Sequence, residues 1–276
     1  MDSAENMELS YSESLACSSA ILKKAKELGA SIAGICDLSH LKKAPSFTLA
    51  PKLPQADVGS RESSLGLKPG EVFWPEDAKS AIVIAYEHPK DQLELDWWFG
   101  KHDPPGNKIL VDINKKLSAW IEKNYPIKTY PCPYHVEKGG VFLKDAAYYA
   151  GLGCIGKNNL FITPEYGPRV RLRAMLFSVK LPSTGPSAFN PCEECDSPCL
   201  QNCPGNAFNE VIYSAETMGQ EILPGRSGTY SREKCNNQMK TDSSNAKEQI
   251  APEVSSEPVK IIKYCRNCEF SCPVGK

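Results

Sequence analysis

Eight of the twelve cysteines in this sequence lie in its C-terminal part, and their spacing is typical of metal ligands. Residues 192–204 read CEECDSPCLQNCP, residues 264–276 read YCRNCEFSCPVGK, and both runs contain a final Cys-Pro. The eight are Cys192, Cys195, Cys199, Cys203, Cys235, Cys265, Cys268 and Cys272. The other four, which are scattered earlier in the chain, are Cys17, Cys36, Cys132 and Cys154. Because a reducing cytoplasm disfavours disulfides, the C-terminal group is predicted to bind metal.

Eight thiolates are the number that two 4Fe–4S clusters require. In bacterial two-cluster ferredoxins the last cysteine of each run binds the other cluster. This rule assigns one cluster to Cys192, Cys195, Cys199 and Cys272. It assigns the other cluster to Cys203, Cys235, Cys265 and Cys268.

One gap departs from the ferredoxin spacing, because the segment DSP places three residues before Cys199 where the usual gap has two. Pro198 is expected to form a small bulge that keeps Cys199 within reach of its cluster. Four-thiolate zinc sites are the alternative, since Cys-x2-Cys pairs also build them. Zinc ribbons would show separated pairs without two Cys-Pro endings, so the sequence favours iron–sulfur clusters.

Residues 149–173, YAGLGCIGKNNLFITPEYGPRVRLR, form the densest motif before the cysteine runs. Their glycines permit close backbone approach to a bulky ligand. Lys157 and three arginines supply positive charge, and Asn158 and Asn159 offer amide donors and acceptors. The segment therefore predicts either a polar, glycine-lined binding surface or a turn-rich corner of the core. It matches neither the Walker nor the dinucleotide-binding glycine pattern.

The periodicity of apolar residues predicts the elements that position these motifs. Helices are expected at residues 13–28, 107–125 and 143–151. Strands are expected at residues 31–36, 80–86 and 171–181. Two prolines make residues 127–134 extended. This order implies a mixed α/β or α+β layer structure that ends near residue 185.

Three stretches lack such periodicity. Residues 42–75 contain prolines and glycines and are predicted to form a long loop. Residues 181–191 are expected to act as a hinge. Residues 240–258 are polar and low in aromatic residues, which predicts a mobile excursion.

The composition is that of an ordinary globular protein, with 41% hydrophobic residues, 24% charged residues and a formal net charge of −1. This charge gives no electrostatic footprint for nucleic acid or an anionic membrane, so neither is expected as a partner. No apolar run reaches the ~18 residues of a membrane span. The N-terminal residues lack the features of a secretion signal and no twin-arginine pair occurs, which predicts a cytoplasmic protein.

Residues 150–176, AGLGCIGKNNLFITPEYGPRVRLRAML, followed by the double cysteine run, resemble the cobalamin-dependent reductases that comprise epoxyqueuosine reductase and the reductive dehalogenases. LKKAKELGASIAGIC near the N-terminus and SAIVIAY at residues 80–86 also match the early part of those proteins. The resemblance covers nearly the whole chain. It implies an α+β fold in which residues 1–185 form a nitroreductase-like corrinoid-binding domain and residues 186–276 form a ferredoxin-like domain with two 4Fe–4S clusters.

The resemblance also implies which residues contact the corrinoid, whose cobalt would have a lower face free of protein ligands and would be reduced to Co(I). These residues are Gly151, Gly153, Gly156, Asn158, Tyr166, Gly167, Arg169 and Arg171. Structural ion pairing is the alternative for Arg169 and Arg171.

Reductive cleavage at cobalt needs a proton donor near the corrin. Epoxyqueuosine reductases have an Asp shortly before the Ala-Gly-Leu-Gly motif, and the resemblance places Glu137 there. Dehalogenases use a Tyr helped by a basic residue, and Tyr134 and Lys157 lie nearest to those roles. A solvated loop carboxylate is the alternative for Glu137. Cys154, within the glycine motif, could approach the cofactor, although an inert buried cysteine is the more common case.

The expected function is a cytoplasmic reductase that takes electrons from a ferredoxin-type or flavodoxin-type donor and passes them through both clusters and cobalamin to a small organic substrate. Epoxyqueuosine reductases carry a further helical-repeat region for tRNA, which this sequence does not show. The alternative is an electron-transfer or corrinoid-handling protein that acts on a partner corrinoid protein. Flavin in place of the corrinoid is a third possibility.

Overall fold

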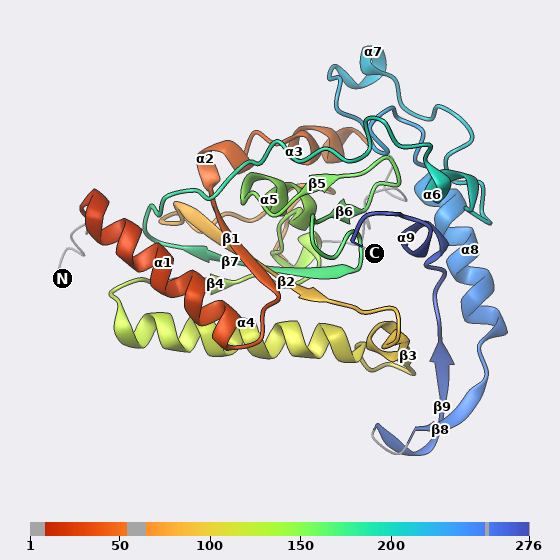
Figure 1. Cartoon of the computed structure of the whole chain (residues 1–276), viewed down its shortest axis with the longest axis horizontal. Helices are drawn as coiled ribbons and strands as arrows, with labels where there is room; N and C mark the ends of the chain where they lie inside the picture. Colours follow the sequence, from red (N-terminus) through yellow and green to blue (C-terminus); the bar gives the residue numbers. More distant parts are fainter. Residues whose placement is uncertain (1–8, 54–64, 252–253, 276) are drawn as a thin grey trace.

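The computed structural model describes residues 9–53, 65–251 and 254–275. Its centre is a four-stranded antiparallel sheet with the strand order β1-β2-β7-β4 (Figure 1). The strands are β1 (Ile32–Asp37), β2 (Ser80–Glu87), β4 (Thr129–Pro131) and β7 (Val170–Phe177). The continuous apolar run of β2 is buried on both faces, which confirms the predicted buried strand.

Two long helices, α1 (Tyr11–Glu27) and α4 (Pro105–Asn124), cover one face of the sheet (Figure 1). Both helices confirm the apolar periodicity of the sequence. The residues of α4 that face the sheet are Leu110, Ile113, Leu117 and Ile121. They pack on alternate strand residues, Ile35, Ile82, Ile84, Met175 and Phe177, because successive side chains of a strand point to opposite faces.

The other face carries smaller side chains and shorter helices. Its strand residues include Cys36, Ala81, Val83 and Ala174. The helices on this side are α2 (Leu38–Leu41), α3 (Pro45–Leu49) with the 3-10 turn η1 (Ala50–Lys52), and α5 (Leu143–Tyr149). At Gly34 an added Cβ would lie 2.3 Å from the carbonyl oxygen of Ala150, so the end of α5 packs directly on β1. The predicted loop at 42–75 thus begins with two short helices, and residues 54–64 of it lie outside the described residues.

Several short elements connect the sheet to the rest of the molecule. The glycine-rich motif leads from α5 through a hairpin of β5 (Cys154–Ile155) and β6 (Phe161–Ile162) into β7. The remaining short elements are η3 (Leu93–Asp96), β3 (Trp98–Phe99) and η4 (Val136–Lys138). The hairpin therefore places the motif at the edge of the second layer, where the cysteine-bearing part of the chain lies.

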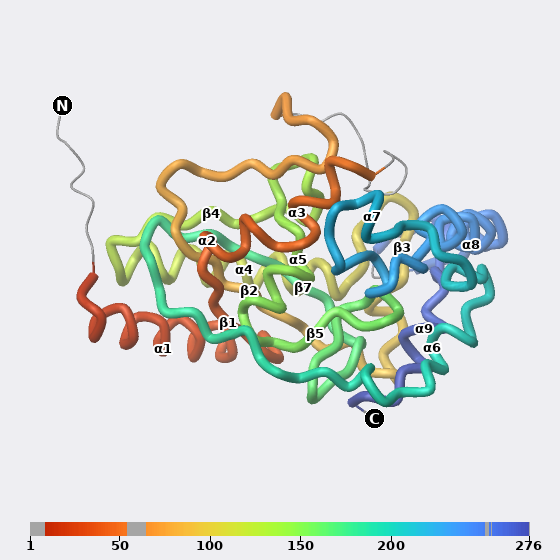
Figure 2. Tube along the Cα trace, turned by 90° about the horizontal axis from the view of Figure 1, so that it is seen from above, coloured from red at the N-terminus to blue at the C-terminus, as the bar shows by residue number. Residues whose placement is uncertain are grey.

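The part of the chain after residue 190, called the tail below, gathers at the end of the molecule that is remote from the N-terminus (Figure 2). Its elements are α6 (Pro198–Gln201), α7 (Ala215–Met218), α8 (Arg232–Asn245), β8 (Glu248–Ala251), β9 (Ser255–Ile262) and α9 (Asn267–Phe270). β9 lies between β3 and β8 in a three-stranded sheet, so the tail is paired directly with the first part of the chain. Among the described residues, no helix has both the length and the apolar character that a bilayer crossing requires.

The predicted mobile excursion at residues 240–258 contains more secondary structure, in its described residues 240–251 and 254–258, than its composition predicts. Residues 240–245 end α8, and β8 and β9 form a hairpin that projects from the body in Figure 1. The hairpin is anchored by Phe99, Ala251 and Ile261, which are buried together. Lys263 lies 3.7 Å from the ring centroid of Trp97 at the same junction. A few apolar contacts with the first part of the chain therefore replace the internal core that this polar stretch lacks.

Candidate cluster and cofactor site

The cysteines of the first run and the last cysteine of the second run lie close together. Burial raises the pKa of the Cys199 thiol to about 11, and three neighbouring thiols add to this effect. These neighbours are Cys272, Cys192 and Cys195. Burial also raises the pKa of Cys272, whose charged neighbours include Cys192 and Cys195. The four thiols are the set that the ferredoxin rule assigns to one cluster.

A second group of thiols surrounds α9. Burial raises the pKa of Cys268 to about 12, and the cysteines that add to it are Cys235, Cys265 and Cys203. Burial raises the pKa of Cys265 too, and Cys203 and Cys235 are again among its neighbours. These four are the set assigned to the other cluster. That either set binds iron stays a prediction.

A turn and a short helix present the sulfurs of the first run. Ser197 has the left-handed backbone angle φ = +59°, and α6 begins directly after it at Pro198. The backbone N–H of Ser197 donates to Cys195 Sγ at 3.4 Å, and that of Ala207 donates to Cys203 Sγ at 3.4 Å. The extra residue of the DSP gap is thus taken up by the turn at Ser197, and Cys199 stays beside its partners.

In the described part of the chain, no three His, Cys, Asp or Glu side chains lie close enough together to bind one metal ion. In a four-iron cluster each cysteine binds a different iron, so its sulfurs stand further apart than those around one zinc ion. The choice between iron–sulfur clusters and zinc stays a prediction from the spacing of the cysteines.

The glycines of the motif are packed against protein. An added Cβ at Gly153 would lie 2.0 Å from the carbonyl oxygen of Ile162, and one at Gly156 would lie 2.4 Å from Ile162 Cδ1. At Gly151, with φ = +72°, the nearest atom is the carbonyl oxygen of Thr184 at 2.7 Å. These contacts explain the three glycines without a ligand, which is the second of the two readings that the sequence leaves open. Their role as corrinoid contacts stays a prediction.

Gly167 joins the motif to the end of the tail. An added Cβ there would lie 2.1 Å from the carbonyl oxygen of Val274, and φ is +57°. The neighbouring Tyr166 is half-buried, and its backbone N–H donates to Thr163 Oγ1 at 3.1 Å. Burial raises the pKa of Tyr166, and the carboxylates of Glu87 and Glu165 raise it further. The hydroxyl of Tyr166 is therefore a neutral donor at physiological pH.

Two polar residues of the motif hold both cysteine runs. Asn158 is 2% exposed, and its Nδ2 donates to the carbonyl oxygen of Cys268 at 3.3 Å. Lys157 Nζ donates to the carbonyl oxygen of Cys195 at 3.3 Å. The motif thus contacts a loop of each predicted cluster. In the described part of the chain, Lys157 bonds the first cysteine run and makes no hydrogen bond or ion pair with Tyr134 or Glu137.

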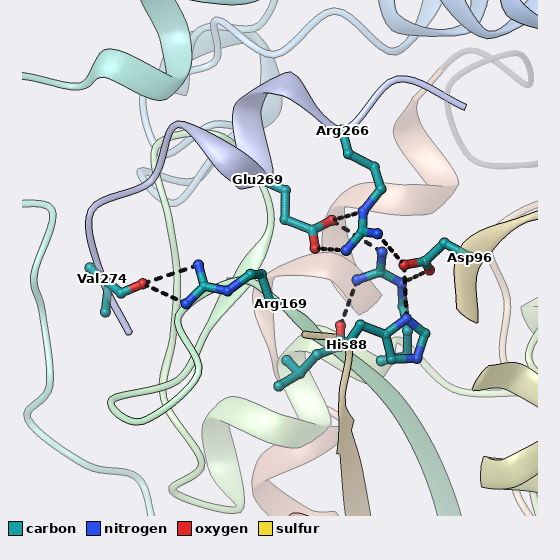
Figure 3. A network of polar contacts seen from close by, with 8 residues as sticks. His88, Asp96, Arg169, Arg266, Glu269 and Val274 are labelled. Atoms are coloured by element: carbon teal, nitrogen blue, oxygen red, sulfur yellow. Dashed lines mark hydrogen bonds and ion pairs between the residues drawn. The ribbon is translucent and has the colours of Figure 1, made fainter. Parts of the chain in front are cut away.

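A buried ionic network joins β7 and η3 to the second cysteine run (Figure 3). Arg171 bonds Asp96 through Nε at 2.8 Å and Glu269 through Nη2 at 3.1 Å. Arg266 pairs with Glu269 through hydrogen bonds and with Asp96 through an ion pair at 2.7 Å. His88 Nδ1 lies 2.8 Å from Asp96 Oδ2. The network brings the first part of the chain and α9 together.

Charges in this network set the ionisation of Asp96. Burial raises the pKa of its carboxyl group, but the hydrogen bond from His88 and the positive charges of Arg171 and Arg266 outweigh burial and hold the pKa below its ordinary value. Arg171 therefore makes structural ion pairs, the alternative to cofactor contact. The sequence does not single out Asp96, Arg266 or Glu269, although the charged pair between ligand cysteines at i, i+3 spacing is a visible signal.

Arg169 is engaged by the end of the tail. Its guanidinium donates to the carbonyl oxygens of Val274, at 3.5 Å, and Gly275 (Figure 3). The Arg169 carbonyl oxygen in turn accepts from the backbone N–H of His88 at 2.8 Å. Both arginines that the resemblance assigns to the corrinoid are thus fixed by protein groups in this structure.

The predicted proton donors lie in one loop. Tyr134 is 57% exposed, and its ring stacks edge-on to His135 with centroids 5.3 Å apart. His135 Nδ1 lies 3.4 Å from Glu137 Oε1. The guanidinium carbon of Arg173 lies 5.8 Å from the Tyr134 ring centroid. The structure thus brings Tyr134, His135 and Glu137 together beside Arg173, an arginine of the glycine-rich motif that the sequence analysis did not link to the proton donors.

Cys154 has partners that its position in the sequence does not reveal. It is 4% exposed and packs with Cys192, Cys272 and Ile162. Burial raises the pKa of Cys154 to about 11, the Arg226 guanidinium lowers it, and the thiols of Cys192 and Cys272 raise it.

No protein-family model matches the chain. Two curated relatives are named epoxyqueuosine reductase. The protein from Gloeobacter violaceus is 38% identical over 122 residues, which cover 44% of this chain and 37% of the relative. The protein from Synechocystis sp. is 31% identical over 127 residues, which cover 43% of each chain. The matched region thus spans less than half of the length of these relatives.

Solved structures share the fold across almost the entire chain. Epoxyqueuosine reductase from Streptococcus thermophilus superposes with a TM-score of 0.59 and 24% identity, over 93% of this chain and 65% of that one. A catabolic reductive dehalogenase in complex with 3-bromo-4-hydroxybenzoic acid gives a TM-score of 0.63 and 19% identity, over 97% of this chain and 33% of that one. An epoxyqueuosine reductase with an epoxyqueuosine-modified tRNA-Tyr stem loop gives 0.55 and 18%, over 93% and 64%.

The sequence matches cover less than half of the chain, and the structural matches cover nearly all of it. The named homologues are oxidoreductases, and both families use 4Fe–4S clusters and cobalamin. The neighbour with a bound tRNA stem loop runs against the expectation, drawn from the net charge and the missing helical-repeat region, that nucleic acid is not a partner of this chain. The chain is a sequence homologue of the epoxyqueuosine reductases and has the fold that they share with the reductive dehalogenases, as its motifs predicted.

Proposed function

We propose that this chain is a corrinoid-dependent iron–sulfur reductase that passes electrons through two 4Fe–4S clusters to the cobalt of a cobalamin and on to an organic substrate. The observation that carries the proposal is the gathering of eight cysteines into two groups of four, each in contact with the glycine-rich motif. Homology to oxidoreductases and the shared fold support it. Residues 1–185 and 186–276 are proposed as its two domains.

The chemistry of the two thiol groups suits two clusters. Each group contains four cysteines that influence one another electrostatically, and backbone N–H groups already donate to Cys195 and Cys203. Such N–H···S bonds stabilise the charge of a cluster and raise its reduction potential. The proposed iron ligands are the eight cysteines named above, in the two sets that the structure brings together.

The fit of a corrinoid rests on Arg173 and Tyr134. Arg173 is 4% exposed, and its Nε–H is buried without a hydrogen-bond partner among the described residues. It lies beside the exposed Tyr134 ring. Corrinoids carry amide and phosphate oxygens at their edge, which such a donor suits. When bound, cobalamin supplies a cobalt centre that exchanges electrons with the substrate.

The residues of the Tyr134 loop are proposed to handle the proton. The Tyr134 hydroxyl is exposed on a loop and can donate to a substrate atom. Glu137 and His135 form a polar pair that can return a proton to it or act directly. Arg173 lies close to the Tyr134 ring and places a positive charge beside this loop.

Structural neighbours bind two classes of substrate, a nucleic acid and a small aromatic acid. One neighbour holds a tRNA stem loop and another holds a halogenated hydroxybenzoate. We propose a small organic substrate, an external ferredoxin-type or flavodoxin-type donor and a cytoplasmic location. Turnover assays that include an epoxyqueuosine-modified stem loop test whether the substrate is a nucleic acid instead.

Anaerobic purification with quantification of iron and cobalt tests the proposal. About eight irons per chain are expected, with the broad visible absorption of 4Fe–4S clusters, and titration with cobalamin should show saturable binding. Arg173→Met should weaken that binding about tenfold or more, because a charge-assisted hydrogen bond is lost. Lys180→Met, which removes an exposed surface cation, is the matched control. A colourless zinc-loaded protein, or a clustered one that ignores cobalamin, contradicts the proposal.

The second candidate is an electron-transfer or corrinoid-handling protein that acts on a partner. The packed glycines favour it, because an added Cβ at Gly151, Gly153 or Gly156 would meet protein atoms. It predicts cobalt reduction in an added corrinoid protein but no turnover of a free organic substrate. Extraction of bound cofactor separates both candidates from a flavoprotein.

A further inference from the structure

Cys154 is a ninth cysteine within the first cluster site. It lies on β5 in the first part of the chain, whereas the eight predicted ligands all lie in the tail. Its side chain shares one buried apolar group with Cys192 and Cys272, together with Ile162. The side chains of three cysteines from three separate segments therefore pack in one group.

Arg226 fixes the sulfur of Cys154 in place. Its guanidinium donates to the carbonyl oxygen of Ile155 at 2.6 Å, to Asn190 Oδ1 at 2.7 Å and to Cys154 Sγ at 3.4 Å. The backbone of Arg226 has φ = +69°, a left-handed conformation that is costly for a residue with a side chain. The surrounding contacts sustain this conformation, and it places the guanidinium against the Cys154 sulfur.

A cluster iron binds a cysteine sulfur that reaches it with suitable geometry. Cys154 is held by Arg226 next to two predicted ligands of the same cluster. Cys195 and Cys199 belong to that predicted cluster but lie outside the buried group that contains Cys154. The ligands that Cys154 could replace are therefore Cys192 and Cys272.

We propose that Cys154 is a reserve ligand of the first cluster, positioned by Arg226 to bind the iron of Cys192 or Cys272 when either thiolate is displaced or lost. The proposal rests on the proposed function, since it requires that the first group of thiols holds a 4Fe–4S cluster. In the exchange one Fe–S(Cys) bond breaks and another forms, a proton moves from the incoming thiol to the outgoing thiolate, and no electrons are transferred.

The test compares alanine variants of the cluster ligands, reconstituted anaerobically and assayed for iron and by low-temperature electron paramagnetic resonance. Cys192→Ala should keep about eight irons per chain and show no three-iron signal, because Cys154 takes the vacant position. Cys192→Ala combined with Cys154→Ala should fall to about seven irons with a three-iron signal. Cys195→Ala removes a thiol outside the buried group that Cys154 shares with Cys192 and Cys272. It is the matched control and should give the three-iron signal by itself.

Two further variants keep the test decisive. Cys272→Ala carries the same expectation as Cys192→Ala and serves should the latter not fold. Arg226→Ala in the Cys192→Ala background should restore the three-iron signal, since the sulfur is no longer held in position. If Cys192→Ala and Cys272→Ala both lose iron or fail to fold while Cys195→Ala keeps a three-iron cluster, the proposal is overturned but the two-cluster function stands. If the unaltered chain binds no clusters, both fall together.

Discussion

At the residue scale, Lys144 shows how burial near the motif makes stability depend on pH. Its Nζ donates to the carbonyl oxygen of Asn159 at 2.6 Å, and burial lowers the pKa of its ammonium group to about 8. Nearby Asp145 opposes this shift and Arg232 adds to it. In the unfolded chain the pKa of lysine is about 10.4, so the unfolded state binds more protons between these values and stability rises with pH.

The prediction for Lys144 follows from that sign. Between about pH 8 and about pH 10 the unaltered chain should gain up to about 3 kcal/mol of unfolding free energy, and Lys144→Met should lack this gain. Chemical denaturation at both pH values measures it. Lys138→Met, in which an exposed lysine is replaced, is the control and should keep the gain. Parallel pH profiles for the unaltered chain and Lys144→Met would contradict the account.

The sequence identifies residues whose role shows in their spacing along the chain, and it does not identify partners that are distant in sequence. The two cysteine groups follow a spacing rule, so both sets are predictable from the sequence, even with an extra residue before Cys199. The partners of Arg171 are not, because Asp96 lies 75 positions away and Glu269 lies 98 positions away. The packing of Gly153 is equally hidden from the sequence. The sequence shows that another group can approach this glycine closely, but not that the group is the carbonyl of Ile162.

At the element scale, Asp96 at the end of η3 is the point where β7 and α9 are held together. It faces Arg171 from β7 and Arg266 from the turn before α9. Asp96→Asn leaves these two buried guanidinium groups short of a counter-charge, which should lower the unfolding free energy by about 3 kcal/mol. Chemical denaturation checks it against Glu94→Gln, an exposed carboxylate in the same turn. If Asp96→Asn and Glu94→Gln lower the unfolding free energy equally, the ionic network does not contribute to stability beyond an exposed carboxylate.

Elements with strong periodicity are predictable, and elements stabilised from outside are not. The helices at 11–27 and 105–124 and the strands at 32–37 and 80–87 begin and end within a few residues of their predicted bounds, because each buries a continuous apolar face. β8 and β9 have no such face of their own. They form because β3 pairs with β9 and because Phe99 packs on Ile261, and neither contact leaves a pattern within residues 240–258.

At the scale of the whole molecule, the tail is connected to the first part of the chain at several separate places. Lys157 and Asn158 bond the two cysteine runs, and Arg169 bonds the carbonyls of Val274 and Gly275. The pairing of β3 with β9 adds a fourth connection. Order in the cysteine runs is therefore coupled to order in the segment that leads into β7, and the two proposed domains should unfold as one cooperative unit.

Iron removal tests this coupling. A cluster that binds only the folded state adds its binding free energy to the stability of everything that unfolds with it. Anaerobic chelation of iron should therefore lower the Tm of the sheet and of α1 and α4, followed by far-ultraviolet circular dichroism, by several degrees or more. Asn158→Ala should reduce that loss, because it uncouples the second run from the motif; Asn124→Ala, at the far end of α4, is its control. An unchanged helical transition after complete loss of iron would mean that the first part of the chain folds independently of its cysteine-bearing tail.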